Sequence, residues 1–165
     1  MIALENIKIV LWDFDDTLCM HEFHDGNGDS DHMYNVDVLL HGTDAWSTCK
    51  PNIHMKKFMT LCCDKGIRQG LISSTIFYKH AMNKCDWVKD KYGVELENFC
   101  VGTPEAKLDM MLAIADAYNY KRDEILIVDD FWENLERAAN NGFQACTPME
   151  IVNFVTDKGY NEKGY

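Results

Sequence analysis

The chain has 165 residues, of which 47% are hydrophobic and 26% charged, proportions that predict one globular domain with a single core. It has no run of 18 apolar residues and no basic N-terminal region followed by a long apolar stretch, so we expect neither a membrane span nor a secretory signal. The formal net charge of -11 argues against a broad basic face for nucleic acid and leaves only a local patch for such a partner.

Apolar runs and helical patterns alternate along the chain. The first run, 7–12, is apolar and largely β-branched, which predicts a strand covered on both faces. After a polar stretch at 20–50 comes a predicted helix at 51–65, with Pro51 in its first turn and Gly66 beyond its end. The other expected strands are 67–73, 99–101, 124–128 and 143–146. The other expected helices are 77–92, 104–118 (with Thr103 as N-cap and Pro104 first), 131–141 and 149–157.

This alternation predicts the α/β fold class, a Rossmann-like parallel sheet with helices on both faces. We expect a single domain over 1–156, containing a long insertion at 20–50, and a polar C-terminal tail at 157–165. In such a sheet the ligand crevice lies beyond the carboxyl ends of the strands.

The cysteines are odd in number, scattered, and never spaced as C-x-x-C. They are Cys19, Cys49, Cys62, Cys63, Cys85, Cys100 and Cys146. This pattern favours reduced thiols over a disulfide framework or a zinc site, and with the absence of a signal it predicts a cytoplasmic protein.

Carboxylates follow two of the expected strands. Asp13, Asp15 and Asp16 come after the first strand, and Asp129 and Asp130 come after 124–128. One aspartate at a strand end reads as a turn residue or a helix N-cap. Two such clusters at one sheet edge need a cation, and hard oxygen ligands favour Mg²⁺.

Two further groups belong to the same edge. Ser73, followed by Ser74, ends the second strand, and Lys107 lies early in the helix that precedes the second acid cluster. Hydroxyl, ammonium and metal together can hold a phosphoryl group. Asp13 could then attack phosphorus as a nucleophile. Like charges around Asp15 predict a raised pKa, so that it could protonate a leaving alkoxide and later deprotonate water.

These segments resemble the four motifs of the haloacid dehalogenase superfamily, in order, across 7–146. DFDDTL resembles the first motif, Ser73 the second, Lys107 the third and IVDDFWEN the fourth. The resemblance implies that Asp13 is nucleophile and Mg²⁺ ligand. It implies that Asp15 is general acid/base and a metal ligand through its backbone carbonyl.

The same resemblance assigns the remaining positions. Ser73 and Lys107 would bind phosphate, Asp130 would be a metal ligand, and Asp129 would be a ligand or the neighbour of one. Thr17 would support the loop, and Asn134 stands where many relatives have a further acid. Phosphatases of the superfamily have an acid at the position of Asp15, which dehalogenases and transport ATPases lack, so the motif favours phosphomonoester hydrolysis.

The insertion at 20–50 is short beside the cap domains of larger relatives, so the resemblance implies a flap or minimal cap and an open site. It contains DGNGDSDH, which begins like a calcium loop, but Ser30 and Val36 occupy the positions of the required Gly and Glu. We therefore expect a mobile polar loop there.

The leading hypothesis is a Mg²⁺-dependent phosphatase similar to the small magnesium-dependent phosphatases, acting through an aspartyl-phosphate on a phosphorylated substrate of unknown class. One alternative is a nucleic-acid 3′-end or nucleotide phosphatase, against which the net charge counts. An alternative of another class is a non-catalytic module that binds a phosphorylated ligand or a partner through 20–50. The presence of both Asp13 and Asp15 argues against that module, because binding alone does not need both carboxylates.

Overall fold

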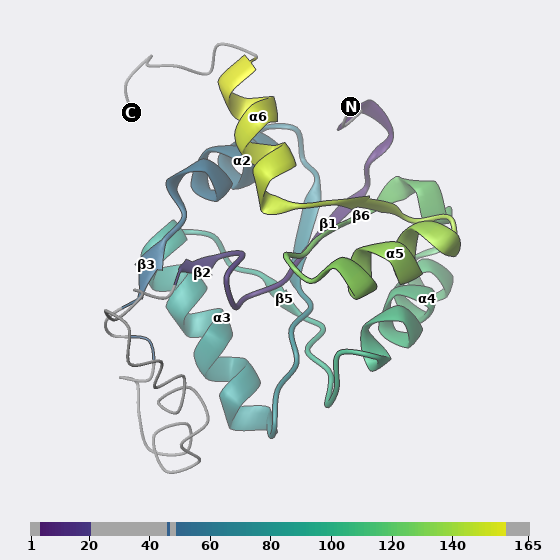
Figure 1. Ribbon diagram of the computed structural model, residues 1–165, viewed down its shortest axis with the longest axis horizontal. Coiled ribbons are helices and arrows are strands. Elements are labelled where there is room, and N and C mark those ends of the chain that lie inside the picture. The colour runs from purple at the N-terminus through teal and green to yellow at the C-terminus, as the bar shows by residue number, and fades with distance from the viewer. Residues whose placement is uncertain (1–3, 21–45, 47–48, 158–165) are drawn as a thin grey trace.

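The computed structural model describes residues 4–20, 46 and 49–157. Its main sheet has five parallel strands in the order β5-β4-β1-β6-β7 (Figure 1). They are β1 (Ile9–Trp12), β4 (Arg68–Leu71), β5 (Glu97–Asn98), β6 (Ile125–Val128) and β7 (Gln144–Cys146). The helices are α2 (Ile53–Asp64), α3 (Tyr78–Tyr92), α4 (Ala106–Tyr118), α5 (Trp132–Asn140) and α6 (Pro148–Asp157), with short 3-10 turns at Leu4–Asn6 and Arg122–Glu124.

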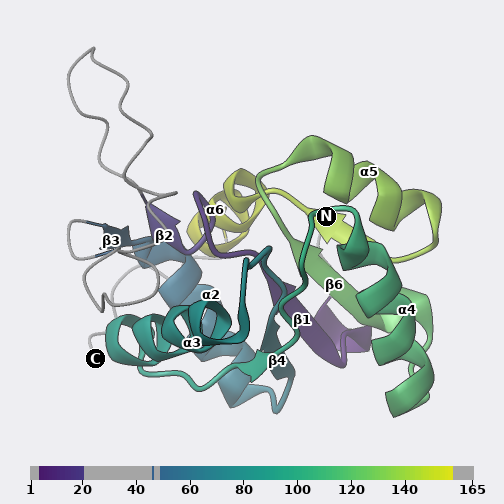
Figure 2. The same ribbon diagram turned by 90° about the horizontal axis from the view of Figure 1, so that it is seen from below.

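Helices cover both faces of this sheet (Figure 1 and Figure 2). Val10 and Trp12 of β1 pack with α2, α3 and α6, whereas Ile9 and Leu11 pack with α4 and α5. Successive strand residues point to opposite faces, so a strand that is apolar at every position must be covered twice. The prediction of an α/β fold with helices on both faces is confirmed.

The strand order determines where on the sheet a ligand is expected to bind. β1 is central, with Trp12 opposite Leu71 of β4 and Val128 of β6. The chain builds β4 and β5 on one side of β1 and then crosses to build β6 and β7 on the other side. The order reverses between β1 and β6, and ligands of such folds bind outside the carboxyl ends of the strands at this point. Asp13 and Asp129 follow these two strands directly.

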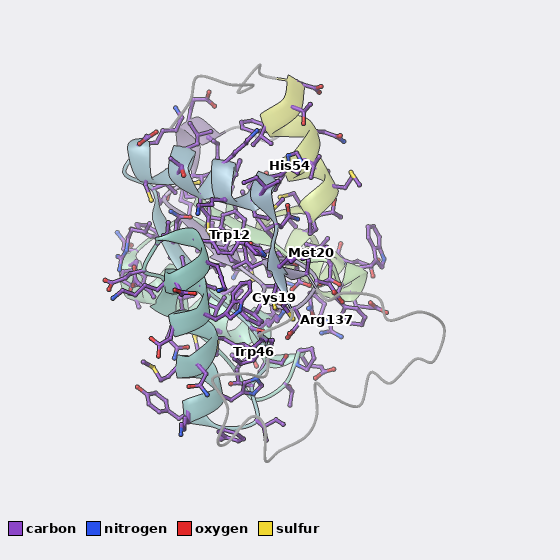
Figure 3. All side chains as sticks on the ribbon, turned by 90° about the vertical axis from the view of Figure 1, so that its left-hand side faces the viewer. Trp12, Cys19, Met20, Trp46, His54 and Arg137 are labelled. Atoms are coloured by element: carbon purple, nitrogen blue, oxygen red, sulfur yellow. The ribbon has the colours of Figure 1, made fainter. Side chains whose placement is uncertain are left out.

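A second, two-stranded antiparallel ribbon pairs β2 (Cys19–Met20) with β3 (Lys50–Pro51). It joins the two ends of the insertion; the rest of the predicted flap, 21–45 and 47–48, and most of the predicted tail, 158–165, lie outside the described residues. Trp46 is described, and its ring packs edge-on against Phe14 and stacks on His80 of α3. Figure 3 labels Trp46 and Trp12, and both belong to the core cluster that contains buried residues of α2 and α3.

Several predicted boundaries differ from the structure by a few residues, and three of these differences have a local cause. Helix α2 begins at Ile53, because Pro51 pairs in β3 and the Asn52 side chain caps the helix by accepting from the His54 N–H. The strand predicted at 99–101 lies earlier, at Glu97–Asn98, and within 99–101 only Val101 forms a bridge, an isolated parallel one with Ser74.

The third boundary is the start of α4. Thr103 and Pro104 form a turn ahead of this helix, with their carbonyls accepting from the N–H groups of Ala106 and Lys107 at 3.2 Å, so the helix begins at Ala106.

None of the seven cysteines, all of which lie in the described part of the chain, forms a disulfide, and Cys19, Cys49, Cys62 and Cys146 are buried. In the described part of the chain, no helix has the length and apolar character needed to cross a membrane.

Candidate active site

The turn after β1 places the first acid cluster. The Asp13 N–H donates to the Val128 carbonyl at 2.9 Å, which extends the pairing of β1 with β6 by one residue. Phe14 is fully buried, and its carbonyl accepts from the N–H groups of Leu18 and Cys19, closing a tight turn. Asp16 lies in this turn at φ 52, a left-handed conformation that Asp tolerates better than most residues. The turn therefore leaves Asp13 buried, Asp15 half-buried and Asp16 exposed.

Lys107 joins the two acid clusters. Its Nζ donates to Asp13 Oδ1 and to Asp129 Oδ2, each at 2.7 Å. The three side chains are between 0% and 9% exposed, so these are charge-assisted hydrogen bonds inside the protein. The nucleophile and the metal ligand expected from separate strands are thus held by one ammonium group from α4.

Asp129 has further donors. Phe131 N–H donates to Asp129 Oδ1 at 2.9 Å, and Asn134 Nδ2 donates to Oδ2 at 3.0 Å. Asp130 is exposed, and Thr17 Oγ1 contacts its Oδ1 at a long 3.5 Å. Thr17, predicted to support the loop, thus contacts Asp130, and Asn134, which stands where many relatives have a further acid, donates to Asp129.

The three carboxylates Asp13, Asp129 and Asp130 can each offer an oxygen within 4.8 Å of the other two. Lys107 supplies one positive charge for three carboxylates, so a divalent cation would balance the remainder. The all-oxygen donor set suits a hard cation such as Mg²⁺. These residues fit the predicted metal.

Burial of this centre shifts the pKa values of its charged groups. Desolvation raises the pKa of Asp13 to about 7, with Asp129 adding to the rise and Lys107 opposing it. Burial acts to lower the pKa of Lys107, but the two carboxylates outweigh it and raise the pKa above its usual value. The Lys107 ammonium therefore stays charged at neutral pH.

Ser73 lies beyond β4, on the same edge. Its carbonyl accepts from the Val101 N–H at 3.0 Å, and the Thr75 N–H donates to the Val101 carbonyl at 2.8 Å, so the segment is tied down on both sides of Ser74. Ser73 is buried and Ser74 half-buried. The structure brings all of the predicted site residues to one edge of the sheet.

Sequence reasoning missed Lys84 of α3. Its Nζ donates to Asp15 Oδ2 at 2.7 Å, to Ser73 Oγ at 2.8 Å and to the Ser74 carbonyl at 3.1 Å. The helical spacing of Ala81, Lys84 and Val88 puts this lysine on the buried stripe of the helix. Lysine is almost never fully buried without a partner, so this position was a detectable signal.

Comparison of the sequence with protein-family models and with curated proteins found no match. Solved structures do match. The cobalt-bound deoxy-D-mannose-octulosonate 8-phosphate phosphatase YrbI from Haemophilus influenzae is 15% identical, with a TM-score of 0.54 over 87% of this chain and 70% of that chain. A HAD family enzyme from Bacteroides thetaiotaomicron, in complex with magnesium and inorganic phosphate, is 14% identical, with a TM-score of 0.52 over 86% of this chain and 93% of that one.

A hypothetical protein from Xanthomonas campestris has 15% identity and a TM-score of 0.54 over 87% of this chain, which spans 65% of the length of that protein. At these identities the likeness concerns the fold. The chain has the α/β fold of the haloacid dehalogenase (HAD) hydrolases, with an acidic cluster where β1 and β6 end.

Proposed function

We propose that this protein is a Mg²⁺-dependent phosphomonoester hydrolase that acts through an aspartyl-phosphate on Asp13. The observation that carries the proposal is the Lys107 ammonium, shared between Asp13 and Asp129 at 2.7 Å in the crevice of the sheet. The fold adds support, because structural neighbours include a named phosphatase and a HAD enzyme in complex with magnesium and phosphate.

The residues divide the reaction into two displacements. In the first, an Asp13 oxygen forms a bond to phosphorus while the bond to the ester oxygen breaks, and Asp15 gives its proton to the departing alkoxide. In the second, Asp15 takes a proton from water, the water oxygen bonds to phosphorus, and the Asp13 carboxylate leaves as phosphate is released. Asp15 is half-buried, so it can exchange protons with both the leaving group and water.

Charge repulsion is the obstacle that the site must overcome, since a phosphate dianion has to approach a carboxylate. Lys107 offsets the Asp13 charge directly, and the Ser73 hydroxyl can donate to a phosphate oxygen. Asp13, Asp129 and Asp130 are the side chains that would hold Mg²⁺, with the Asp15 carbonyl as a further ligand predicted from the motif. When bound, Mg²⁺ supplies Lewis-acid stabilisation of the phosphoryl oxygens.

The test is hydrolysis of p-nitrophenyl phosphate by wild type, Asp13→Asn and Asp16→Asn, each with Mg²⁺ and with chelator. Asp16→Asn is the matched control, because it removes an exposed carboxylate from the same turn, and Asn also tolerates the left-handed conformation there. We expect Mg²⁺-dependent turnover by wild type and Asp16→Asn and none by Asp13→Asn. An Asp13→Asn protein as active as wild type would refute the nucleophile assignment.

Two other functions have distinct signatures. A nucleic-acid 3′-end phosphatase must bind a 3′-phosphorylated oligonucleotide in a salt-dependent way, and its activity on that oligonucleotide must exceed its activity on a simple ester. A non-catalytic module must bind its phosphorylated ligand while turning over no ester. The contacts of Asp15 and Lys107 suit the general acid/base and the charge compensation that turnover needs, so we favour the hydrolase over these two alternatives.

A further inference from the structure

We propose that Lys84 is a positioning residue that holds the general acid/base Asp15 and the phosphate-binding hydroxyl of Ser73 in one fixed arrangement. This inference rests on the proposed function, since both partners take their roles from it. Lys84 belongs to α3, on the opposite face of the sheet from the helix that carries Lys107. The site thus has two ammonium groups, each pairing with a different aspartate of the DFD segment.

The setting of Lys84 leaves its ammonium group little freedom. Its side chain is 2% exposed, and its Nζ lies 4.9 Å from the centre of the Phe14 ring, the residue between Asp13 and Asp15. Phe14 in turn packs edge-on against Trp46 and Trp87. The ammonium has three hydrogens and uses them on three acceptors, Asp15, Ser73 and Ser74. A group with all its donors used in a packed pocket is fixed in place.

The direction of the bond to Ser73 matters for phosphate binding. An ammonium can only donate, so Ser73 Oγ is the acceptor at 2.8 Å. The hydroxyl hydrogen then remains for another partner, because Ser73 Oγ donates no hydrogen bond to the residues that the structure describes. Lys84 therefore orients Ser73 as a donor, which is the role that a phosphate oxygen requires.

The bond to Asp15 matters for proton transfer. The Asp15 side chain is 34% exposed and lies in a turn, and a carboxylate at such a position has several rotamers open to it. Lys84 holds Oδ2 at 2.7 Å. The other carboxylate oxygen can then point in only a limited set of directions. Correct placement of an acid/base group accounts for a large share of its contribution to the rate.

Packing alone does not explain a lysine here. A buried charge costs free energy on desolvation, and removing one partner of an ion pair is costly mainly where the other charge stays buried and uncompensated. Asp15 is exposed enough to be hydrated if Lys84 is removed. A purely structural role therefore predicts that kcat falls in Lys84→Met only as far as the fold is destabilised, whereas a positioning role predicts a large fall in kcat with the urea midpoint nearly unchanged.

The experiment compares Lys84→Met with Lys89→Met, an exposed lysine on the same helix whose ion pair is with Glu95. Each substitution is made alone and together with Asp15→Asn. For every variant, kcat and KM are measured with p-nitrophenyl phosphate, and stability is measured by urea unfolding. We expect Lys84→Met to lower kcat/KM about 100-fold, a loss typical of misplaced reacting groups, with its urea midpoint near that of wild type. Lys89→Met should leave kcat/KM unchanged.

The double variant separates positioning from general damage. If Lys84 acts through Asp15, Lys84→Met should reduce kcat by less than about 3-fold once Asp15 is already Asn, because residues that act as a unit are not additive. Lys84→Arg, which keeps the charge, should recover part of the loss. Wild-type activity in Lys84→Met, or the same fold-loss of kcat in both backgrounds, would overturn the inference.

Crystal structures of wild type and Lys84→Met give a readout that needs no turnover. We expect the Asp15 carboxylate to leave its position in Lys84→Met while Asp13 and Lys107 stay in place. An Asp15 side chain unmoved in Lys84→Met would refute positioning even if the wild type proved inactive. An inactive wild type with a displaced Asp15 in the variant would instead refute the phosphatase function and leave the positioning role standing.

Discussion

Lys107 Nζ lies 2.7 Å from Asp129 Oδ2, with the Asp129 side chain 0% exposed. Removing one partner of such a buried pair leaves the other charge without compensation, which costs more than the intact pair contributes. Here a single ammonium compensates Asp13 as well. The contact on which the proposed function rests is therefore also a point where a single substitution should destabilise the fold.

The first prediction concerns Lys107→Met. Because it leaves two buried carboxylates facing each other, it should lower the free energy of unfolding by about 3–5 kcal/mol in chelator. Added Mg²⁺ should return part of this loss, since it can replace the missing positive charge. The measurement is urea unfolding with and without Mg²⁺. Lys57→Met, an exposed lysine of α2, is the control and should change the free energy by less than about 0.5 kcal/mol. A loss under 1 kcal/mol for Lys107→Met would contradict the pairing.

Tyr92 carries the second prediction. Its hydroxyl donates to the Leu18 carbonyl at 2.5 Å and accepts from the Asn52 N–H at 2.9 Å, which links α3 to the residue that precedes β2 and the residue that follows β3. Tyr92→Phe removes both bonds and leaves the Asn52 N–H and the Leu18 carbonyl with their direct hydrogen bond at 3.3 Å, so it should cost about 0.5–1.5 kcal/mol in urea unfolding. Tyr78→Phe removes a hydroxyl from a side chain that is 76% exposed and should be neutral. Equal effects of the two variants would show that the Tyr92 bonds contribute nothing.

Gly70 of β4 carries the third prediction. A Cβ at this position would lie 2.5 Å from Cδ2 of Phe99, so the ring must move. Gly70→Ala should destabilise the fold by about 1–3 kcal/mol, measured by thermal or urea unfolding. Gly102→Ala, where no atom lies within 4 Å of the new Cβ, should be close to neutral. Adding Phe99→Ala to Gly70→Ala should remove the clash, and a double variant whose losses simply add would argue against steric contact.

The fourth prediction is a pH effect at His80. Burial and the nearby Lys84 lower the pKa of His80 to about 4, with Asp15 opposing. Between that value and the ordinary pKa near 6.5, the unfolded chain binds more protons than the folded protein, so stability falls as pH decreases through this window. The lowered pKa corresponds to a loss of up to about 3 kcal/mol between pH 7 and pH 4.

His80→Gln removes this titration while keeping a polar side chain beside Trp46. Urea unfolding at pH 7 and pH 4.5 should show a smaller fall in stability for the variant than for wild type. Other groups titrate in the same range, Asp13 among them with the opposite sign, so the comparison between the two proteins is the measure that isolates His80. Identical falls in stability would show that His80 is protonated equally in folded and unfolded chains.

Much of the candidate site could be predicted because each strand end is marked locally. Asp13 and Asp129 follow uninterrupted apolar runs, and parallel strands bring such ends together. The start of α4 was harder, because Thr103-Pro104 suits a helix start in isolation, whereas in the fold these residues form the turn that precedes Ala106. The local preference of a residue for a helix start is weak compared with the tertiary contacts of the folded chain.

The sequence by itself determined the α/β class and the positions of the acids. A strand that is buried on both faces must be apolar at every position, so the strands appear as continuous apolar runs, and the polar residues stand at the ends of these runs. Only the tertiary structure decided which cation meets which acid. Lys107 reaches Asp13 across 94 positions and Lys84 reaches Asp15 across 69, and these pairings depend on the faces that α4 and α3 cover. The position of a residue in the apolar pattern indicates whether it is buried, whereas its interaction partner is determined only when distant elements pack together.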